Sequence, residues 1–318
     1  KFMMDHHVDT EVYYWNFDLS LMADNTDSED TDIRLLPFLS ILNDKSGNTQ
    51  GNDRIVSLFQ SIDITQKNKD TIYYTDLLNS MKLEIHHVME DKLNALDLQK
   101  ITLFGITAKY NQWIPGMILA EKVKKKAPHI KVIVGGFGSK DRAEEAMRLC
   151  PYFDITTWGE GEYPLLQLSQ ELESENGNLS SVPRLLFRHE NQIIQSETNK
   201  SEYLDFENYI YPDFDDFIEN YPEDQDPDII NIPINTIRSC YWSKCKFCDF
   251  NKGYKLRIRS PECIVKELKH LTDTYGFTTY TFVDSDTFGN FEHFDKLLDL
   301  IIDLKLQNDA DYVFWAEI

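Results

Sequence analysis

The sequence predicts an α/β protein in which a Rossmann-like domain with a parallel sheet is followed by a second, shorter α/β unit. Short apolar runs alternate with amphipathic stretches from Ile101 to Glu173, a pattern typical of βαβ units. The same alternation returns from Ile232 onward, after an acidic segment that contains prolines. The chain has 318 residues, 42% of them apolar, which is enough for two domains of roughly 150 residues each.

The first hundred residues precede this alternation. Residues 11–22 begin with aromatic and β-branched side chains, which favours a strand that runs into a turn. Residues 24–32 are acidic and polar, as in a solvated loop. We expect two helices, one around 53–61 and one around 76–98; in the second, apolar residues recur at helical spacing, namely Leu83, Val88, Leu93 and Leu96.

The Rossmann-like domain takes its elements from residues 101–195. The expected strands cover 101–107, 131–136 and 153–157, the expected helices lie near 113–126, 141–149 and 163–173, and a hairpin over 184–195 turns at Glu190-Asn191. Glycines follow two of the strands, as Gly135-Gly136 and within Gly159-Glu160-Gly161-Glu162. Flexible backbone therefore lies at the carboxyl ends of the strands, where open α/β sheets bind ligands.

A linker separates the two units. Its prolines and its run of acidic residues favour an extended connector, because like charges repel one another. We therefore divide the chain into 1–198 (Rossmann-like domain), 199–230 (acidic, proline-containing linker) and 231–318 (second unit). The second unit is predicted to have strands at 232–237, 279–283 and 312–317. Ser260 as N-cap and Pro261 begin a helix that ends near Tyr275, and a further helix covers 291–305.

Composition excludes several kinds of partner. With 32 basic and 54 acidic residues the formal net charge is −22, which disfavours nonspecific binding to nucleic acid or to an anionic membrane. No apolar run approaches the ~20 residues that a membrane span needs, and Lys1-Phe2-Met3-Met4-Asp5 does not have the layout of a secretory signal. We expect a cytoplasmic protein that binds small molecules, peptides or other proteins.

Three of the five cysteines are clustered and suggest metal chemistry. Cys240, Cys245 and Cys248 have the spacing C-x4-C-x2-C on a loop after a predicted strand, and such clustering argues against a disulfide framework. A closed zinc site needs four ligands, and Cys263 could be the fourth. A 4Fe-4S cluster held by three cysteines would leave one iron open to a small molecule. Cys150, before a proline at a helix end, is expected to serve packing.

The cysteine loop resembles that of the radical S-adenosylmethionine (SAM) enzymes. Their commonest spacing is C-x3-C-x-aromatic-C, and Phe247 occupies the aromatic position. The longer first gap, Cys-Tyr-Trp-Ser-Lys-Cys, is similar to members with an N-terminal cobalamin-binding-like domain, some of which mature ribosomal peptides (RiPPs). Other segments match in order across residues 100–318: Ile133-Val-Gly-Gly136, Trp158-Gly-Glu-Gly-Glu162, Arg259-Ser-Pro-Glu262 and Phe282-Val-Asp284.

This resemblance implies a fold and a chemistry. The expected fold is a B12-binding-like parallel sheet followed by the first half of a partial (β/α)6 barrel. The three cysteines would ligate three irons of a 4Fe-4S cluster, and SAM would chelate the fourth and be cleaved to a 5'-deoxyadenosyl radical. Phe247 would pack near the adenine, and Asp284 would line the SAM pocket. C-methylation or another radical modification of a peptide or small-molecule natural product would follow.

Cobalamin binding is a separate expectation from the same resemblance. The histidine motif D-x-H-x-x-G is absent, since Asp5-His6-His7 has Thr10 in place of the glycine. Related radical enzymes bind cobalamin without this motif. The expected cobalamin-lining residues are Thr107 to Trp113, Gly135, Gly136, and Gly159 to Glu162 with Glu160 and Gly161. The alternative is that these glycines form tight turns and that Glu160 and Glu162 have turn or helix-cap roles.

The cysteine loop is also a basic island in an acidic protein. Residues 238–259 contain seven basic residues and one acid, Asp249. This charge could hold an anionic group or dock an acidic electron donor such as a flavodoxin.

Two further expectations concern the alternative function and the extent of the chain. The competing interpretation is a non-catalytic Rossmann-like binding module with a structural zinc site at Cys240, Cys245, Cys248 and Cys263. Residues 232–318 suffice for β-α-β-α-β, about half of a six-unit barrel, and the strand near Val12 to Phe17 resembles a second strand of such a domain. We therefore expect an internal portion of an enzyme, with little turnover by itself.

Overall fold

The computed structural model describes residues 1–15, 35–62, 70–109, 112–190, 192–198, 202–208, 210–222, 230–248, 254–287, 290–308 and 310–316. Within these ranges, the first domain contains a five-stranded sheet in the order β1-β2-β3-β4-β5. Strands β1 (Leu103–Thr107), β2 (Lys131–Phe137) and β3 (Ile155–Trp158) are parallel. Strands β4 (Leu185–His189) and β5 (Gln192–Gln195) add antiparallel, which confirms the expected hairpin.

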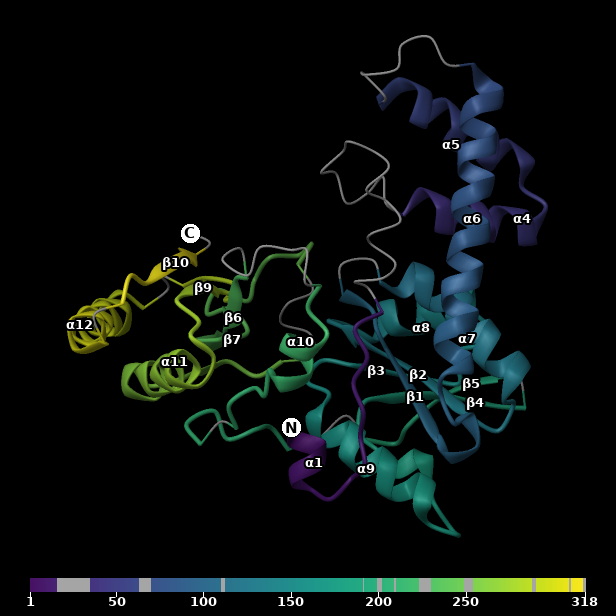
Figure 1. Ribbon diagram of the computed structural model, residues 1–318. Helices are drawn as coiled ribbons and strands as arrows, with labels where there is room; N and C mark the ends of the chain where they lie inside the picture. Colours follow the sequence, from purple (N-terminus) through teal and green to yellow (C-terminus); the bar gives the residue numbers. More distant parts are fainter. Residues whose placement is uncertain are drawn as a thin grey trace.

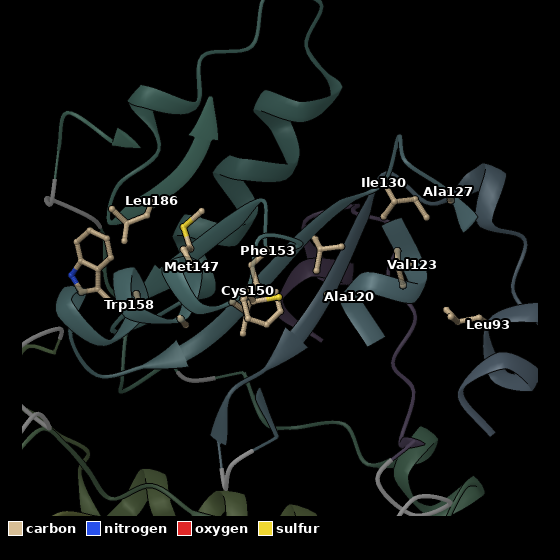
Figure 2. Close-up of a cluster of buried hydrophobic side chains, with 14 residues drawn as sticks. Leu93, Ala120, Val123, Ala127, Ile130, Met147, Cys150, Phe153, Trp158 and Leu186 are labelled. Atoms are coloured by element: carbon tan, nitrogen blue, oxygen red, sulfur yellow. The ribbon is translucent and has the colours of Figure 1, made fainter. Parts of the chain in front are cut away.

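Helices α7 (Trp113–Lys126), α8 (Lys140–Leu149) and α9 (Glu162–Glu173) lie within one residue of their predicted bounds. Their apolar sides and the sheet form the main core of this domain. Figure 2 shows this core running from Trp158 and Leu186 past Met147 and Cys150 to Val123. Cys150 is 1% exposed and burial raises the pKa of its thiol to about 11, so it serves packing as predicted.

The second unit begins like a (β/α) barrel. Strands β6 (Ile232–Ile234), β9 (Thr279–Phe282) and β10 (Val313–Ala316) are parallel, and in this part of the described chain they form a three-stranded sheet in the order β10-β9-β6. Each strand therefore lies beside the next one in the sequence. Helices α11 (Pro261–Tyr275) and α12 (Phe291–Asn308) connect them and bury their apolar sides on the sheet.

The start of α11 follows the sequence prediction. The Ser260 hydroxyl accepts a hydrogen bond from the Cys263 N–H at 3.3 Å, Pro261 occupies the first helical position, and Gly276 ends the helix at φ 75°. The expected strand over 232–237 is shorter than predicted. It ends at Ile234, and Ile237 belongs instead to a separate hairpin of β7 (Ile237–Arg238) and β8 (Arg257–Ile258).

The N-terminal region is helical. Helices α4 (Leu36–Ser46), α5 (Thr49–Ile62) and α6 (Thr71–Asn94) form a cap that extends from the Rossmann-like domain, with α6 as its long axis (Figure 1). Their apolar sides pack on one another and, through Ile85 and Met89, on Ile114 and Ile118 of α7. The sequence predicted α5 and α6 but not α4. Of the expected stripe on α6, Leu93 is buried, whereas Leu83 is 62% exposed.

The strand expected over residues 11–22 is wrong for residues 12–15, which form no strand after the short helix α1 (Phe2–Asp5). Their aromatic side chains pack instead of pairing by backbone: Trp15 lies 6.1 Å from Phe104 and Tyr14 lies 5.7 Å from Phe217 between ring centroids. Residues 16–22 and the acidic loop at 24–32 lie outside the described residues.

The linker is not simply an extended connector. Part of it forms the helix α10 (Asp215–Glu219), and Phe214 packs edge-to-face on Tyr275 and Phe277 of the second unit. Phe206 is also buried, at 4% exposure. Prolines and acidic charges suggested an extended chain, but these aromatic side chains hold the segment against folded structure.

Among the residues that the structure describes, no helix combines the length and the low charge needed to cross a bilayer.

Acid should weaken the contact between the helical cap and α7. Glu90 of α6 receives hydrogen bonds from Lys122 at 2.7 Å and from Lys126, which hold its pKa at about 2 instead of 4.5. A carboxyl whose pKa is lower in the folded protein stabilises the fold fully above its unfolded pKa. This contribution is therefore lost as the pH falls from 4.5 to about 2.

The measurement is denaturant unfolding at several pH values in that window. Glu90→Gln should remove part of the acid dependence, by about 0.2–1 kcal/mol, which is typical of partly exposed ion pairs. Identical pH profiles for Glu90→Gln and the parent protein would contradict the assignment.

Candidate functional site

The three clustered cysteines lie on the loop enclosed by the β7–β8 hairpin, which follows the carboxyl end of β6. Cys245 is exposed, and Cys240 and Cys248 are half-buried. The Cys248 N–H donates to the Cys245 carbonyl at 3.3 Å, so these two residues share a turn. Ser239, just before Cys240, has φ 72°, a left-handed conformation that is uncommon for residues other than glycine.

The donor set of this loop fits an iron–sulfur cluster in its chemistry. Soft thiolate ligands suit an iron–sulfur cluster, and the exposed position of Cys245 leaves it accessible to a cofactor. In the described part of the chain, His, Cys, Asp and Glu side chains form no group of three arranged to hold a single metal ion. The assignment of the cysteines as ligands therefore rests on their number and spacing.

Cys263, the fourth ligand of the zinc alternative, is differently placed. It lies in the first turn of α11 and is 8% exposed. Its thiol donates to the Glu207 carbonyl at 3.1 Å and accepts from the Arg259 guanidinium at 3.5 Å. This thiol is therefore engaged by the linker and by a buried arginine, and the structure gives no support to a four-cysteine zinc site.

Asp284 fixes the turn that leads into the cysteine loop. One of its carboxylate oxygens accepts the N–H groups of Thr236 at 2.8 Å and Ile237 at 2.9 Å, and the other accepts the Thr236 hydroxyl. The side chain is 3% exposed, and burial raises its pKa. The sequence placed Asp284 in a SAM pocket; the structure shows its carboxylate bonded to the chain between β6 and β7.

Phe247 lies between two of the cysteines and is 90% exposed. Tyr241 and Trp242 on the same loop are also largely exposed, and Lys244 lies over the Trp242 ring at 4.9 Å. An exposed aromatic side chain beside the thiols is available to pack against a ligand. The Phe247 ring is therefore accessible for the contact with adenine that the resemblance implies.

Several residues expected to line cobalamin meet at one edge of the first sheet. Thr107 at the end of β1 pairs with Gly135 of β2, and the Gly159 N–H after β3 donates to the Phe137 carbonyl at 2.8 Å. Gly136 has φ 96°, where other residues are strained. Small residues therefore gather at the carboxyl ends of neighbouring strands, and we call this the glycine-lined edge.

The rest of that expected set has other surroundings in the described structure. Trp113 packs in the apolar cluster between α7 and the helical cap, and residues 110–111 lie outside the described chain. Gly161 precedes α9, and a Cβ added to it would meet no other atom within 4 Å. The Glu160 carboxylate is bound by two arginines of the second unit.

These arginines belong to the basic island. Arg238 on β7 donates to Glu160 at 2.8 Å and to Glu162 at 2.9 Å, and Arg257 on β8 also donates to Glu160. Arg259 is 0% exposed and pairs with Glu267. Three of the seven basic residues are thus neutralised within the protein. These pairs were not predicted from the sequence, although the excess of base in 238–259 and the acids of Gly-Glu-Gly-Glu could have suggested them.

A Rossmann-like domain, the first three strands of a (β/α) barrel and a three-cysteine loop after the first of these strands form one recognisable architecture. It is the fold of radical SAM enzymes that carry an N-terminal cobalamin-binding domain, as the resemblance implied.

Comparison with solved structures supports this fold. The chain is similar to the radical S-adenosylmethionine methyltransferase TsrM from Kitasatospora setae, solved with cobalamin and a [4Fe-4S] cluster bound (TM-score 0.51, 16% identity, 70% of this chain and 45% of that one). It is also similar to OxsB, a cobalamin-dependent S-adenosylmethionine radical enzyme solved with aqua-cobalamin bound (TM-score 0.55, 16% identity, 73% of this chain and 32% of that one).

Curated relatives agree in kind. An uncharacterized methyltransferase of Pyrococcus horikoshii is 26% identical over 253 residues, which cover 75% of this chain and 53% of the relative. The anaerobic magnesium-protoporphyrin IX monomethyl ester cyclase of Cereibacter sphaeroides is 24% identical over 236 residues, or 68% of this chain and 35% of the relative. The chain thus spans about half the length of the first relative and a third of the second. No family model matches the sequence.

Proposed function

We propose that this chain belongs to a cobalamin-dependent radical SAM enzyme that methylates, or otherwise modifies by a radical route, a peptide or small-molecule natural product. The observation that carries the proposal is the loop with Cys240, Cys245 and Cys248 at the carboxyl end of the first barrel strand. The similarity to a methyltransferase solved with both cofactors supports it. The similarity of the cysteine spacing to that of RiPP-maturing enzymes favours a ribosomal peptide as the substrate.

Each part of the site has a distinct task in this proposal. Cys240, Cys245 and Cys248 hold a 4Fe-4S cluster, while Asp284 fixes the turn that aims the loop. When bound, such a cluster supplies an electron to cleave SAM, and cobalamin supplies a methyl carrier. Phe247 would pack against the adenine of SAM, and the glycine-lined edge with Thr107 and Gly135 would line cobalamin.

The test begins with the full-length protein, purified and reconstituted without oxygen. We expect iron and sulfide bound in proportion to the protein, corrin absorption after incubation with cobalamin, and 5'-deoxyadenosine formed from SAM after reduction. Stoichiometric zinc without iron or sulfide would refute the proposal and favour a zinc-holding binding module. Iron and SAM cleavage without corrin binding would restrict the function to radical chemistry that does not use cobalamin.

A flavodoxin-like reductant is expected to dock on the exposed part of the basic island. The arginines Arg238, Arg257 and Arg259 are paired within the protein. The positive charge available to a partner is therefore that of exposed lysines such as Lys244 and Lys246. The double variant Lys244→Glu/Lys246→Glu should slow cluster reduction by flavodoxin by about tenfold at low salt, because electrostatic steering sets association rates.

Reduction by dithionite, a small inorganic donor, is the control for this variant. It should proceed at the parental rate. An equal slowing with both donors would show that the lysines affect the cluster itself and not the docking of a partner.

A further inference from the structure

A buried carboxylate joins the two halves of the molecule at the cysteine loop. Glu160 follows β3 of the Rossmann-like domain, and its side chain is 3% exposed. It binds Arg238 through one oxygen and Arg257 through the other. We call Glu160, Arg238 and Arg257 the Glu160 clamp. Because Arg238 lies on β7 and Arg257 on β8, Glu160 binds both of the strands that flank the cysteine loop.

The surroundings of the clamp hold its parts in one arrangement. The Glu160 carbonyl accepts a hydrogen bond from Arg184 at 2.5 Å, and Arg257 also donates to the Leu204 carbonyl of the linker at 2.8 Å. The Phe206 ring lies 5.5 Å from the Arg238 guanidinium and 5.3 Å from that of Arg257. Aromatic rings over the cations keep water away, which strengthens the attraction to the carboxylate.

The described residues between the two clamped strands are mostly exposed. Between the two clamped strands, residues 241–247 are exposed, and Ser239 and Ser243 have positive φ angles of 72° and 50°. The hairpin itself pairs through only two residues on each strand. A two-stranded hairpin this short is not stable by itself, so its position depends on contacts outside it.

We propose that Glu160 is a positioning residue for the cysteine loop. By holding both strands of the hairpin against the end of β3, it fixes the three thiols relative to the glycine-lined edge of the Rossmann-like sheet. This inference rests on the proposed function for the purpose of the loop, but the clamp itself acts in the protein without cofactors. Glu162, at the start of α9, has a lesser part, since its carboxylate binds Arg238 on β7, whereas that of Glu160 binds arginines of both strands.

Hydrogen–deuterium exchange on the metal-free, full-length protein tests the clamp directly. Glu160→Gln leaves two arginines facing a neutral amide. We expect exchange in residues 237–248 and 254–258 to become about tenfold faster, while β1, β2 and β3 keep their protection. Glu144→Gln is the matched control, because it removes an ion pair with Arg148 on the surface of α8 in the same domain. It should leave exchange in the loop unchanged.

The second readout is cluster retention. After reconstitution, Glu160→Gln should lose iron to a chelator several-fold faster than Glu144→Gln, with the same initial iron content. If Glu160→Gln does not fold, Arg257→Lys replaces it, because a lysine cannot reach both Glu160 and the Leu204 carbonyl. The loop should then exchange faster in Arg257→Lys than in the parent.

The outcomes are distinct. Loop exchange equal to that of the control, or faster exchange spread evenly over β1, β2 and β3, would overturn the positioning role. If the parent protein binds no iron at all, the proposed function fails, and the exchange result still decides whether the clamp holds the loop.

Discussion

Alanine at Cys240, Cys245 or Cys248 is expected to abolish iron retention and SAM cleavage. A cluster held by three protein thiolates has no spare ligand, so loss of one leaves two irons without a protein donor. Even the loss of a partner that only orients a metal ligand costs about 10–100-fold in metal affinity or activity, and the loss of a ligand should cost more. Iron per chain and 5'-deoxyadenosine formation are the measurements.

The other two cysteines provide matched controls. Cys150 lies in the core of the Rossmann-like domain and Cys263 in α11, both buried. Cys150→Ala and Cys263→Ala should keep iron and SAM cleavage, with a modest loss of stability from the small cavity that each creates. If Cys263→Ala loses metal to the same extent as Cys245→Ala, the result would contradict the three-cysteine cluster and support the four-cysteine zinc site.

Alanine at Asp284 is expected to destabilise the second unit and to disorder the start of the cysteine loop. The change removes the acceptor of two backbone N–H groups and one hydroxyl, all buried. Each buried group left without a partner costs about 1–3 kcal/mol, so the total should reach about 3 kcal/mol or more. Denaturant unfolding followed by a probe in α11 or α12 measures this loss.

Asp284→Asn is the control that separates shape from charge. Its amide oxygen can still accept the N–H groups of Thr236 and Ile237, so most of the stability should remain. Because burial raises the pKa of Asp284 above 3.8, the folded protein holds this proton more tightly than the unfolded chain does. Its contribution therefore declines as the pH rises from 3.8 through the folded pKa, and this decline should be absent in Asp284→Asn. A parental pH profile in the Asn variant would contradict this.

Most of the fold could be predicted from short segments of the sequence. Ser260 and Pro261 marked the start of α11 because capping is a property of neighbouring residues. The alternation of strands and helices from residue 101 was likewise predicted correctly, since each apolar run is buried by elements close in sequence. The failures occur where packing over long distances decides. Aromatic residues at 12–15 resembled a strand, yet they contact Phe104 and Phe217 through their side chains.

The candidate site shows the same division. The spacing of the three cysteines was visible because they lie within nine residues of one another. The tasks of Asp284 and Glu160 were not, because their partners are 48 and up to 97 residues away in the sequence. The family resemblance suggested a ligand pocket for both carboxylates, with a turn or helix-cap role as the alternative for Glu160. Only the fold reveals that each is bonded to the backbone or to the arginines around the cysteine loop.

That separation of 97 residues between Glu160 and Arg257 has a consequence for how the protein forms during synthesis. Strands β6, β9 and β10 lie side by side in the order of the sequence, so this sheet is built from segments of the second unit alone. The cysteine hairpin depends instead on a partner made much earlier, and domains generally fold in the order of synthesis. Glu160 belongs to the part of the chain that is synthesised first, and its two arginines follow later. We therefore expect the cysteine loop to reach its final position only after both halves of the chain have been synthesised.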